Sequence, residues 1–134
     1  MKEINSILKF NNYVVNEIRF KNNENFKQPN GGVPIKFDIK ANKIIEKNNM
    51  KIILFTEIFK DAEKNNYPFE MTVSLTGKFE CEGEEPEKFS KNAIAILYPY
   101  VRAIVSTYTA NANVNALILP AINVNKLIEE DEKN

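Results

Sequence analysis

A long, nearly uncharged segment between Ala93 and Ala112 constrains the fold of this 134-residue chain more than any other feature. Arg102 is its one charged residue, and Pro99 and several tyrosine, serine and threonine side chains interrupt it. An arginine at the middle of a membrane span costs about 2.5–3.5 kcal/mol even on insertion scales. We therefore interpret the segment as a helix of a globular protein, running from about residue 88 to residue 110.

Apolar side chains occupy two faces of this predicted helix. One face comprises Phe89, Ala93, Ile96, Tyr100, Ile104 and Tyr108, and the other comprises Ile94, Leu97, Val101 and Val105. One apolar face can cover a sheet, but the second needs another partner, and a chain of this length has no further layer to supply one. We therefore expect a homo-oligomer that buries about 1,000 Å² or more through this helix. The expected interface residues are Ile94, Leu97, Tyr98, Val101 and Val105.

Period-two alternation of apolar and polar residues predicts four strands before the helix. We place them at about residues 8–22, 33–45, 50–60 and 67–80, as an antiparallel sheet whose last three strands form a meander. The loop between the first two strands holds Asn30-Gly31-Gly32 and two prolines. It is long for a hairpin, so these two strands need not be paired. A short helix is expected at about 124–132, giving a single α+β domain over 1–134.

The composition removes most catalytic chemistries. The chain has no histidine and one cysteine, Cys81, so neither a Ser-His-Asp triad nor a histidine-ligated metal site can form. The glutamates between Glu80 and Glu87 lack the ligand pattern of a calcium loop, and we interpret them as a solvated turn. These carboxylates should raise the pKa of Cys81 and lower its reactivity. We expect no enzyme, no metal and no cofactor.

Charge and cysteine usage narrow the partners and the location. The 18 basic residues balance the 18 acidic ones, which argues against bulk electrostatic binding to nucleic acid or to an anionic membrane. A single cysteine forms no intramolecular disulfide, which fits a reducing compartment. We expect a cytoplasmic protein with no nucleic-acid partner and no membrane insertion.

What remains is apolar surface, around Ile35, in the loop from Val114 to Leu119, and in the last helix. Two interpretations stay open at this point. These residues could belong to an ordinary core, or they could line a hydrophobic groove for other polypeptides.

Four stretches resemble the SecB family of export chaperones. Residues 92–102 (NAIAILYPYVR) resemble that family's (N)xLFPYAR helix, and residues 119–128 (LPAINVNKLI) resemble its L(A/P)PVNFDALF ending. Residues 15–20 resemble the pattern of its first strand, and residues 34–39 (PIKFDI) resemble the PEVKLDLD start of its second. The four matches occur in the family's order and span about residues 10–130.

The resemblance implies a four-stranded antiparallel sheet with two helices on one face, assembled as a dimer of dimers through the long helix. It also implies an ATP-independent holdase, which keeps unfolded or precursor polypeptides soluble and export-competent in hydrophobic grooves. The residues that it places at the client are Ile35, Phe37, Ile39, Val114, Leu117, Val124, Leu127 and Ile128.

The docking surface for the translocase motor SecA departs from the family's pattern. Glu17 occupies one acidic docking position, but Lys21 and Thr72 stand where the family tends to have acidic residues. Docking to SecA by the standard surface is therefore doubtful. An alternative to the general holdase is a non-catalytic interaction protein on the same fold with one dedicated partner, such as a toxin–antitoxin-associated chaperone.

Overall fold

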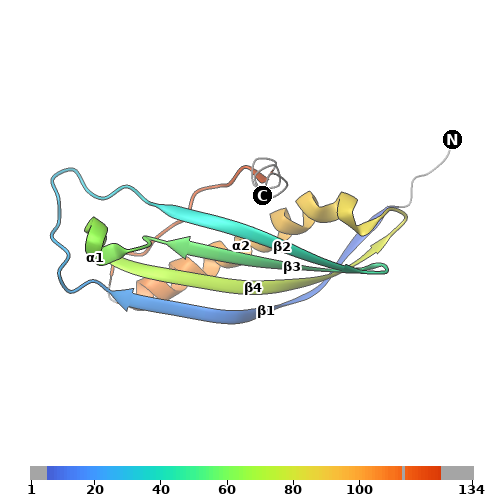
Figure 1. Cartoon of the computed structure of the whole chain (residues 1–134), viewed down its shortest axis with the longest axis horizontal. Coiled ribbons are helices and arrows are strands. Elements are labelled where there is room, and N and C mark those ends of the chain that lie inside the picture. Colours follow the sequence, from blue (N-terminus) through green and yellow to red (C-terminus); the bar gives the residue numbers. More distant parts are fainter. Residues whose placement is uncertain (1–5, 113, 125–134) are drawn as a thin grey trace.

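A computed structural model describes residues 6–112 and 114–124 of the chain (Figure 1). Four strands come first, interrupted by one short helix before the last strand. They are β1 (Ile7–Asn22), β2 (Phe37–Glu46), β3 (Asn49–Ile58), α1 (Ala62–Asn65) and β4 (Phe69–Glu82). A single 3₁₀ turn, η1 (Pro86–Phe89), then leads into the long helix α2 (Ser90–Asn111).

The four strands form one antiparallel sheet in the order β1-β4-β3-β2. The predicted meander of β2, β3 and β4 is confirmed, and β1 pairs with β4 rather than with its sequence neighbour β2. The long loop at residues 23–36 exists because the chain must cross from one edge of the sheet to the other. Two register shifts, between Phe10 and Asn12 and between Val15 and Glu17, interrupt the β1–β4 ladder.

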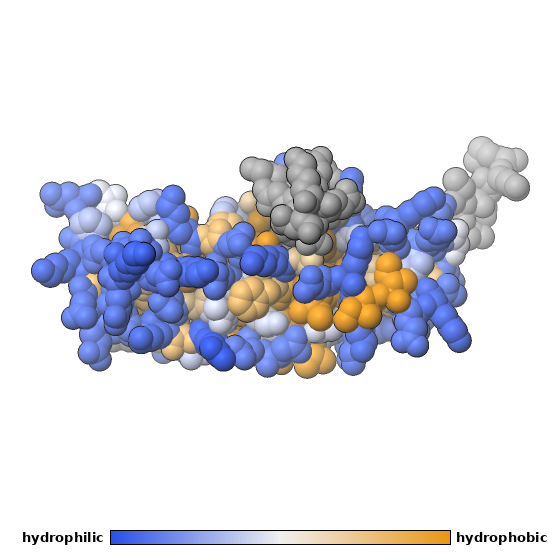
Figure 2. All heavy atoms as spheres, in the orientation of Figure 1, coloured by the Kyte–Doolittle hydropathy of each residue, from blue (hydrophilic) through white to orange (hydrophobic). Residues whose placement is uncertain are grey.

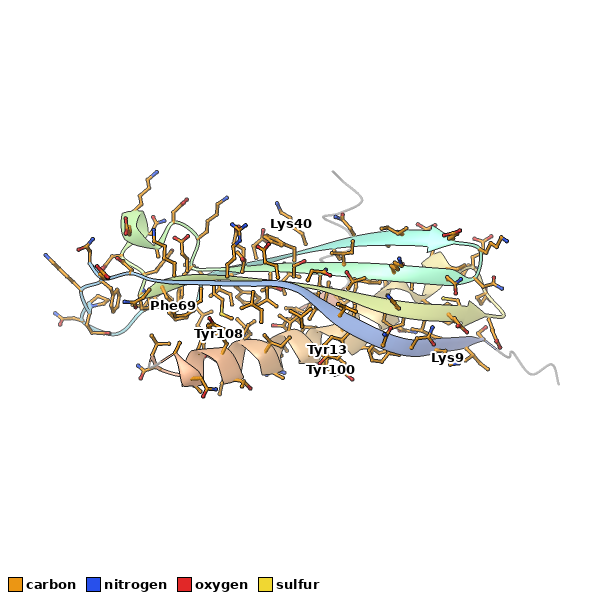
Figure 3. The ribbon with its side chains drawn as sticks, turned by 90° about the horizontal axis from the view of Figure 1, so that it is seen from below. Lys9, Tyr13, Lys40, Phe69, Tyr100 and Tyr108 are labelled. Atoms are coloured by element: carbon orange, nitrogen blue, oxygen red, sulfur yellow. The ribbon has the colours of Figure 1, made fainter. Side chains whose placement is uncertain are left out.

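Helix α2 covers one face of the sheet, which we call the inner face (Figure 3). Every second residue of β4 points inward, so Met71, Val73 and Leu75 are buried while the residues between them are only partly covered. Gly77 lets the helix approach closely, because a Cβ built there would lie 2.4 Å from Leu97 Cδ2. The expected fold class, α+β with a four-stranded antiparallel sheet and the long helix on one face, is confirmed.

Some boundaries differ from the sequence prediction. Strand β2 begins at Phe37, four residues after the expected Val33, because residues 33–36 lie beyond most of β3. The expected polar turn after β3 contains α1, entered at Asp61 with a left-handed φ of 56°. Apart from Val124, the expected C-terminal helix at 124–132 lies outside the described residues.

The five residues predicted for the oligomer interface lie in the core of the single chain. Their side chains are between 0% and 5% exposed, which leaves them almost no area to bury against a second copy; they are Ile94, Leu97, Tyr98, Val101 and Val105. The assignment of these five to an interface is therefore wrong. The other predicted face is buried only in part: Phe89 and Ala93 are buried, whereas Tyr108 packs on Phe20 of β1 and stays 40% exposed.

Candidate functional site

An open groove of about 710 Å³ lies at the end of the molecule where the loop joins β1 to β2 (on the left in Figure 1). The 23–36 loop forms one wall, and the segment after α2, residues 114–117, forms the other. We call this site the client groove. Its apolar lining consists of Phe26, Val33, Ile35, Phe59, Pro68, Phe69, Val114, Ala116 and Leu117.

The loop wall is fixed by two asparagine side chains. Asn23 is buried, and its amide nitrogen donates to the carbonyl oxygens of Ala62 (3.2 Å) and Tyr67 (2.9 Å). Asn66 accepts a hydrogen bond from the backbone N–H of Lys27 and donates one to its carbonyl, both at 2.9 Å. These bonds tie the start of the crossing loop to the turn around α1, so the groove has a defined shape although its wall has no regular secondary structure.

Packed aromatic rings form the floor of the groove. Phe59 and Phe69 meet edge to face with their centroids 5.2 Å apart, and Phe20 stacks on Phe69 with the centroids 5.1 Å apart. Phe59 adopts a left-handed φ of 54°, while its N–H donates to the carbonyl of Lys36 at 2.8 Å. The chain thereby turns away from β2 at this point and leaves Ile35 beside the aromatic floor.

The structure brings three of the predicted client residues together. Ile35, Val114 and Leu117 all line the client groove, and Ile35 is 38% exposed. Phe37 and Val124 are half-buried and pack on the core rather than lining the groove. Ile39 is only 7% exposed, so its assignment as a client contact is wrong: it faces inward on β2. Leu127 and Ile128 lie outside the described residues.

Sequence reasoning missed Phe26, Val33, Phe59 and Phe69 as lining residues. Val33 could have been found, because it stands two residues before Ile35 and an extended chain turns both side chains to the same side. The two strand phenylalanines carried no such signal. Phe59 directly follows the end of β3 and Phe69 begins β4, and only the positive φ of Phe59 and the crossing loop open this end of the sheet to the surface.

The lining of the groove is suited to burial of apolar groups. Glu24 is its one charged lining residue among those described, and the other polar lining groups are mostly side-chain amides. No group of three or more metal-ligating side chains occurs within residues 6–112 and 114–124. Burial raises the pKa of Cys81, so the predicted direction is confirmed while the predicted cause, neighbouring carboxylates, is replaced by desolvation.

A second apolar hollow, of about 380 Å³, lies between the exposed side of α2 and β1. We call it the α2–β1 surface. Tyr13 and Ile18 of β1 face Ile104 and Tyr108 of α2, and the tyrosine rings of this region are visible in Figure 3. Tyr13, Ile18 and Tyr108 are each at least 37% exposed. Strand β1 is an edge strand, so an unpaired backbone edge runs beside this apolar surface.

The outer face of the sheet, away from α2, mixes charges with apolar side chains (Figure 2). Glu17 is exposed there and forms an ion pair with Arg19. Ile44 is 53% exposed on the same face. The described helices include none long and apolar enough to cross a membrane.

These features agree with the comparisons to known proteins. The profile of the SecB family, whose description is preprotein translocase subunit SecB, matches residues 8–134. This chain therefore belongs to the SecB family. An uncharacterized protein of Methanocaldococcus jannaschii, MJ0357, is 38% identical over 126 residues, which cover 87% of this chain and 79% of that relative.

Solved structures share the fold at low sequence identity. The SecB-like chaperone Rv1957 of Mycobacterium tuberculosis, solved with a ChAD peptide from the Rv1956 HigA1 antitoxin, superposes with a TM-score of 0.68 and 13% identity. The match covers 87% of this chain and 91% of that one. A protein of unknown function from Streptococcus agalactiae superposes with a TM-score of 0.54 and 15% identity, covering 87% and 98%.

Proposed function

We propose that this chain is an ATP-independent holdase that binds unfolded or precursor polypeptides in the client groove. The observation that carries the proposal is the meeting of Ile35, Val114 and Leu117, from two distant parts of the sequence, over an aromatic floor in an open groove. A non-catalytic chaperone acting in the cytoplasm agrees with membership of the SecB family.

The physical basis of client binding is non-directional apolar burial. Contact over about 600 Å² is worth roughly 15 kcal/mol before costs, at about 25 cal/mol per Å². Ordering an unfolded client removes much of that gain. A single groove therefore binds weakly, and useful affinity requires several grooves on one oligomer to hold the same client.

The oligomer forms through the α2–β1 surface in this proposal. Its apolar residues, the exposed Tyr13, Ile18 and Tyr108 and the half-buried Ile104, replace the buried five as the interface, and they lie on regular elements rather than on loops. Packing two copies through this surface would cover the exposed side of α2 and the free edge of β1 together. It would leave the client groove open, because the two sites share no lining residue.

A second candidate is an interaction protein with one dedicated partner. The Rv1957 chaperone, which has this fold, was solved with a peptide from an antitoxin, and this favours an antitoxin-like partner as the alternative. SecA remains a doubtful partner. Glu17 forms an ion pair with Arg19, and Lys21 lies opposite Glu70, so the acidic docking pattern is incomplete at these positions.

Suppression of aggregation tests the general holdase. A thermally denatured client protein should stay soluble at a near-stoichiometric amount of this protein, and Ile35→Asp combined with Leu117→Asp should abolish the effect. Ile44→Asp is the matched control, because Ile44 is also exposed but lies on the outer face of the sheet. Unchanged aggregation at a several-fold molar excess of the wild-type protein would refute the proposal.

An affinity capture from cells separates the two candidates. Recovery of one stoichiometric protein, together with no effect on unrelated denatured clients, would favour the dedicated partner. A broad set of unfolded chains, lost when Ile35 and Leu117 are both replaced by aspartate, would reject it.

A further inference from the structure

The segment from Leu117 to Pro120 lies along α2 without regular secondary structure of its own. Its carbonyl oxygens accept hydrogen bonds from three helix side chains. Ser106 Oγ donates to Leu117 (3.1 Å), Arg102 Nε to Leu119 (2.9 Å) and Tyr98 Oη to Pro120 (2.5 Å). The backbone N–H of Leu117 completes the set by donating to Thr109 Oγ1 at 2.8 Å.

The spacing of the helix donors matches the spacing of the carbonyls. Residues 98, 102 and 106 are four apart and lie on one side of α2, spanning about 12 Å at about 1.5 Å per residue. The three steps from 117 to 120 cover about 10 Å when extended. The segment runs antiparallel to the helix, so Ser106, Arg102 and Tyr98 meet the carbonyls of residues 117, 119 and 120 in order, and that of Ile118 is skipped.

Side-chain burial alternates along this segment. Leu119 is fully buried in the core, whereas its neighbour Ile118 is 68% exposed. Thr109, which holds the N–H of Leu117, is itself buried, and its hydroxyl donates onward to the carbonyl of Val105 at 2.8 Å. Leu117 is therefore fixed at both its N–H and its C=O, directly where it lines the client groove.

We propose that Tyr98, Arg102, Ser106 and Thr109 are positioning residues that hold the 114–117 wall of the client groove and thereby set its affinity for polypeptide clients. None of the four lines the groove. They act through Leu117 and the segment after it. This inference rests on the proposed holdase function, because its readout is client affinity.

The test combines hydrogen exchange with client binding in the full-length protein. Ser106→Ala with Arg102→Met removes two donors and leaves the core face of α2 intact. The probe is reduced and carboxymethylated α-lactalbumin, a chain that cannot refold. Amide exchange in residues 114–120 should accelerate, exchange in β3 and β4 should not change, and the Kd for the probe should rise about tenfold.

Two further variants separate positioning from general destabilisation. Tyr98→Phe removes a hydroxyl that holds the segment, whereas Tyr100→Phe removes one that has no hydrogen-bond partner in the described part of the chain. Only the former should weaken binding. Arg102→Lys, which keeps a donor, should recover part of the affinity lost in Arg102→Met.

Each outcome decides the inference. Faster exchange in residues 114–120 with an unchanged Kd would overturn the positioning role, and unchanged exchange would overturn the attachment itself. Equal effects of Tyr98→Phe and Tyr100→Phe would also overturn it. If the wild-type protein fails to bind the probe, the holdase proposal fails and the affinity role falls with it, while exchange still decides whether the four side chains hold the segment.

Discussion

Two apolar flanks of α2 have similar composition but differ in how far their side chains are buried. The side that faces the sheet carries Leu97, Val101 and Val105, all fully buried within one chain. The flank of α2 beside β1 carries Ile104 and Tyr108, which remain partly exposed. One flank of α2 therefore completes the core of the protomer, whereas the flank beside β1 leaves apolar surface exposed.

The difference is best tested at two neighbouring residues. Val105→Asp places a carboxylate at a fully buried position, and an unpaired buried charge costs about 3–5 kcal/mol. We expect this variant to unfold at low urea concentration or to fail to fold, as followed by circular dichroism. This is the largest effect that we predict.

The control for Val105→Asp is the same substitution at the preceding residue, Ile104. Ile104→Asp should change the free energy of unfolding of the protomer by about 1 kcal/mol or less, because Ile104 is only partly buried and its charge can reach water. Equal destabilisation by both variants would show that the two sides of α2 do not differ in the way described.

The side facing the sheet is also tight enough to resist a single added methyl group. A Cβ at Gly77 would lie 2.4 Å from Leu97 Cδ2, and Leu97 is fully buried, so its side chain has little space to rotate away. Gly77→Ala should lower the free energy of unfolding by about 1–3 kcal/mol in urea melts.

A double-mutant cycle identifies the cause of that loss. In a Leu97→Ala background the added methyl fills the space left by the leucine, so Gly77→Ala should cost little or should stabilise the protein. Strictly additive effects would mean that the contact with Leu97 is not the origin of the strain.

The sheet was predictable from the sequence because strand alternation is local. Residues such as Met71, Val73 and Leu75 mark the inner face of β4 without knowledge of any neighbour. The length of the crossing loop also indicated that β1 and β2 need not pair, and they do not. Periodicity gave the two sides of α2 equally well, but only packing decides which side meets the sheet.

The client groove was predictable only in part, for the same reason. Ile35, Val114 and Leu117 carried the resemblance or the exposed apolar pattern, and all three line the groove. Ile39 shares the alternation of Ile35 but sits within β2, so it faces the core. The aromatic floor depends on the turn at Phe59, whose left-handed backbone no sequence pattern indicates.

The exposed side of α2 should govern assembly rather than folding. We expect Ile104→Asp to reduce the molar mass measured by size-exclusion chromatography with light scattering, because it places a charge in the proposed α2–β1 interface. Ile44→Asp, on the outer face of the sheet, is the matched control and should leave the mass unchanged. A wild-type protein that is already a monomer at micromolar concentration would contradict the proposed interface.

The smallest predicted effect concerns an exposed ion pair next to the start of α2. Lys43 Nζ of β2 lies 2.9 Å from Glu87 Oε1 in η1. The hydrogen bond and the charge of Lys43 lower the pKa of Glu87 below its ordinary value of 4.5. Because the pKa of the folded state is the lower one, the ion pair stabilises the fold above the unfolded-state pKa and loses this effect as pH falls through the lowered pKa. Lys43→Met should therefore reduce Tm slightly at neutral pH and not at all at about pH 2–3. Because the pair is exposed, added salt should reduce the difference in Tm between variant and wild type at neutral pH. A difference in Tm between the variant and the wild type that persists unchanged in acid would show that Lys43 acts through packing of its aliphatic stem and not through its charge.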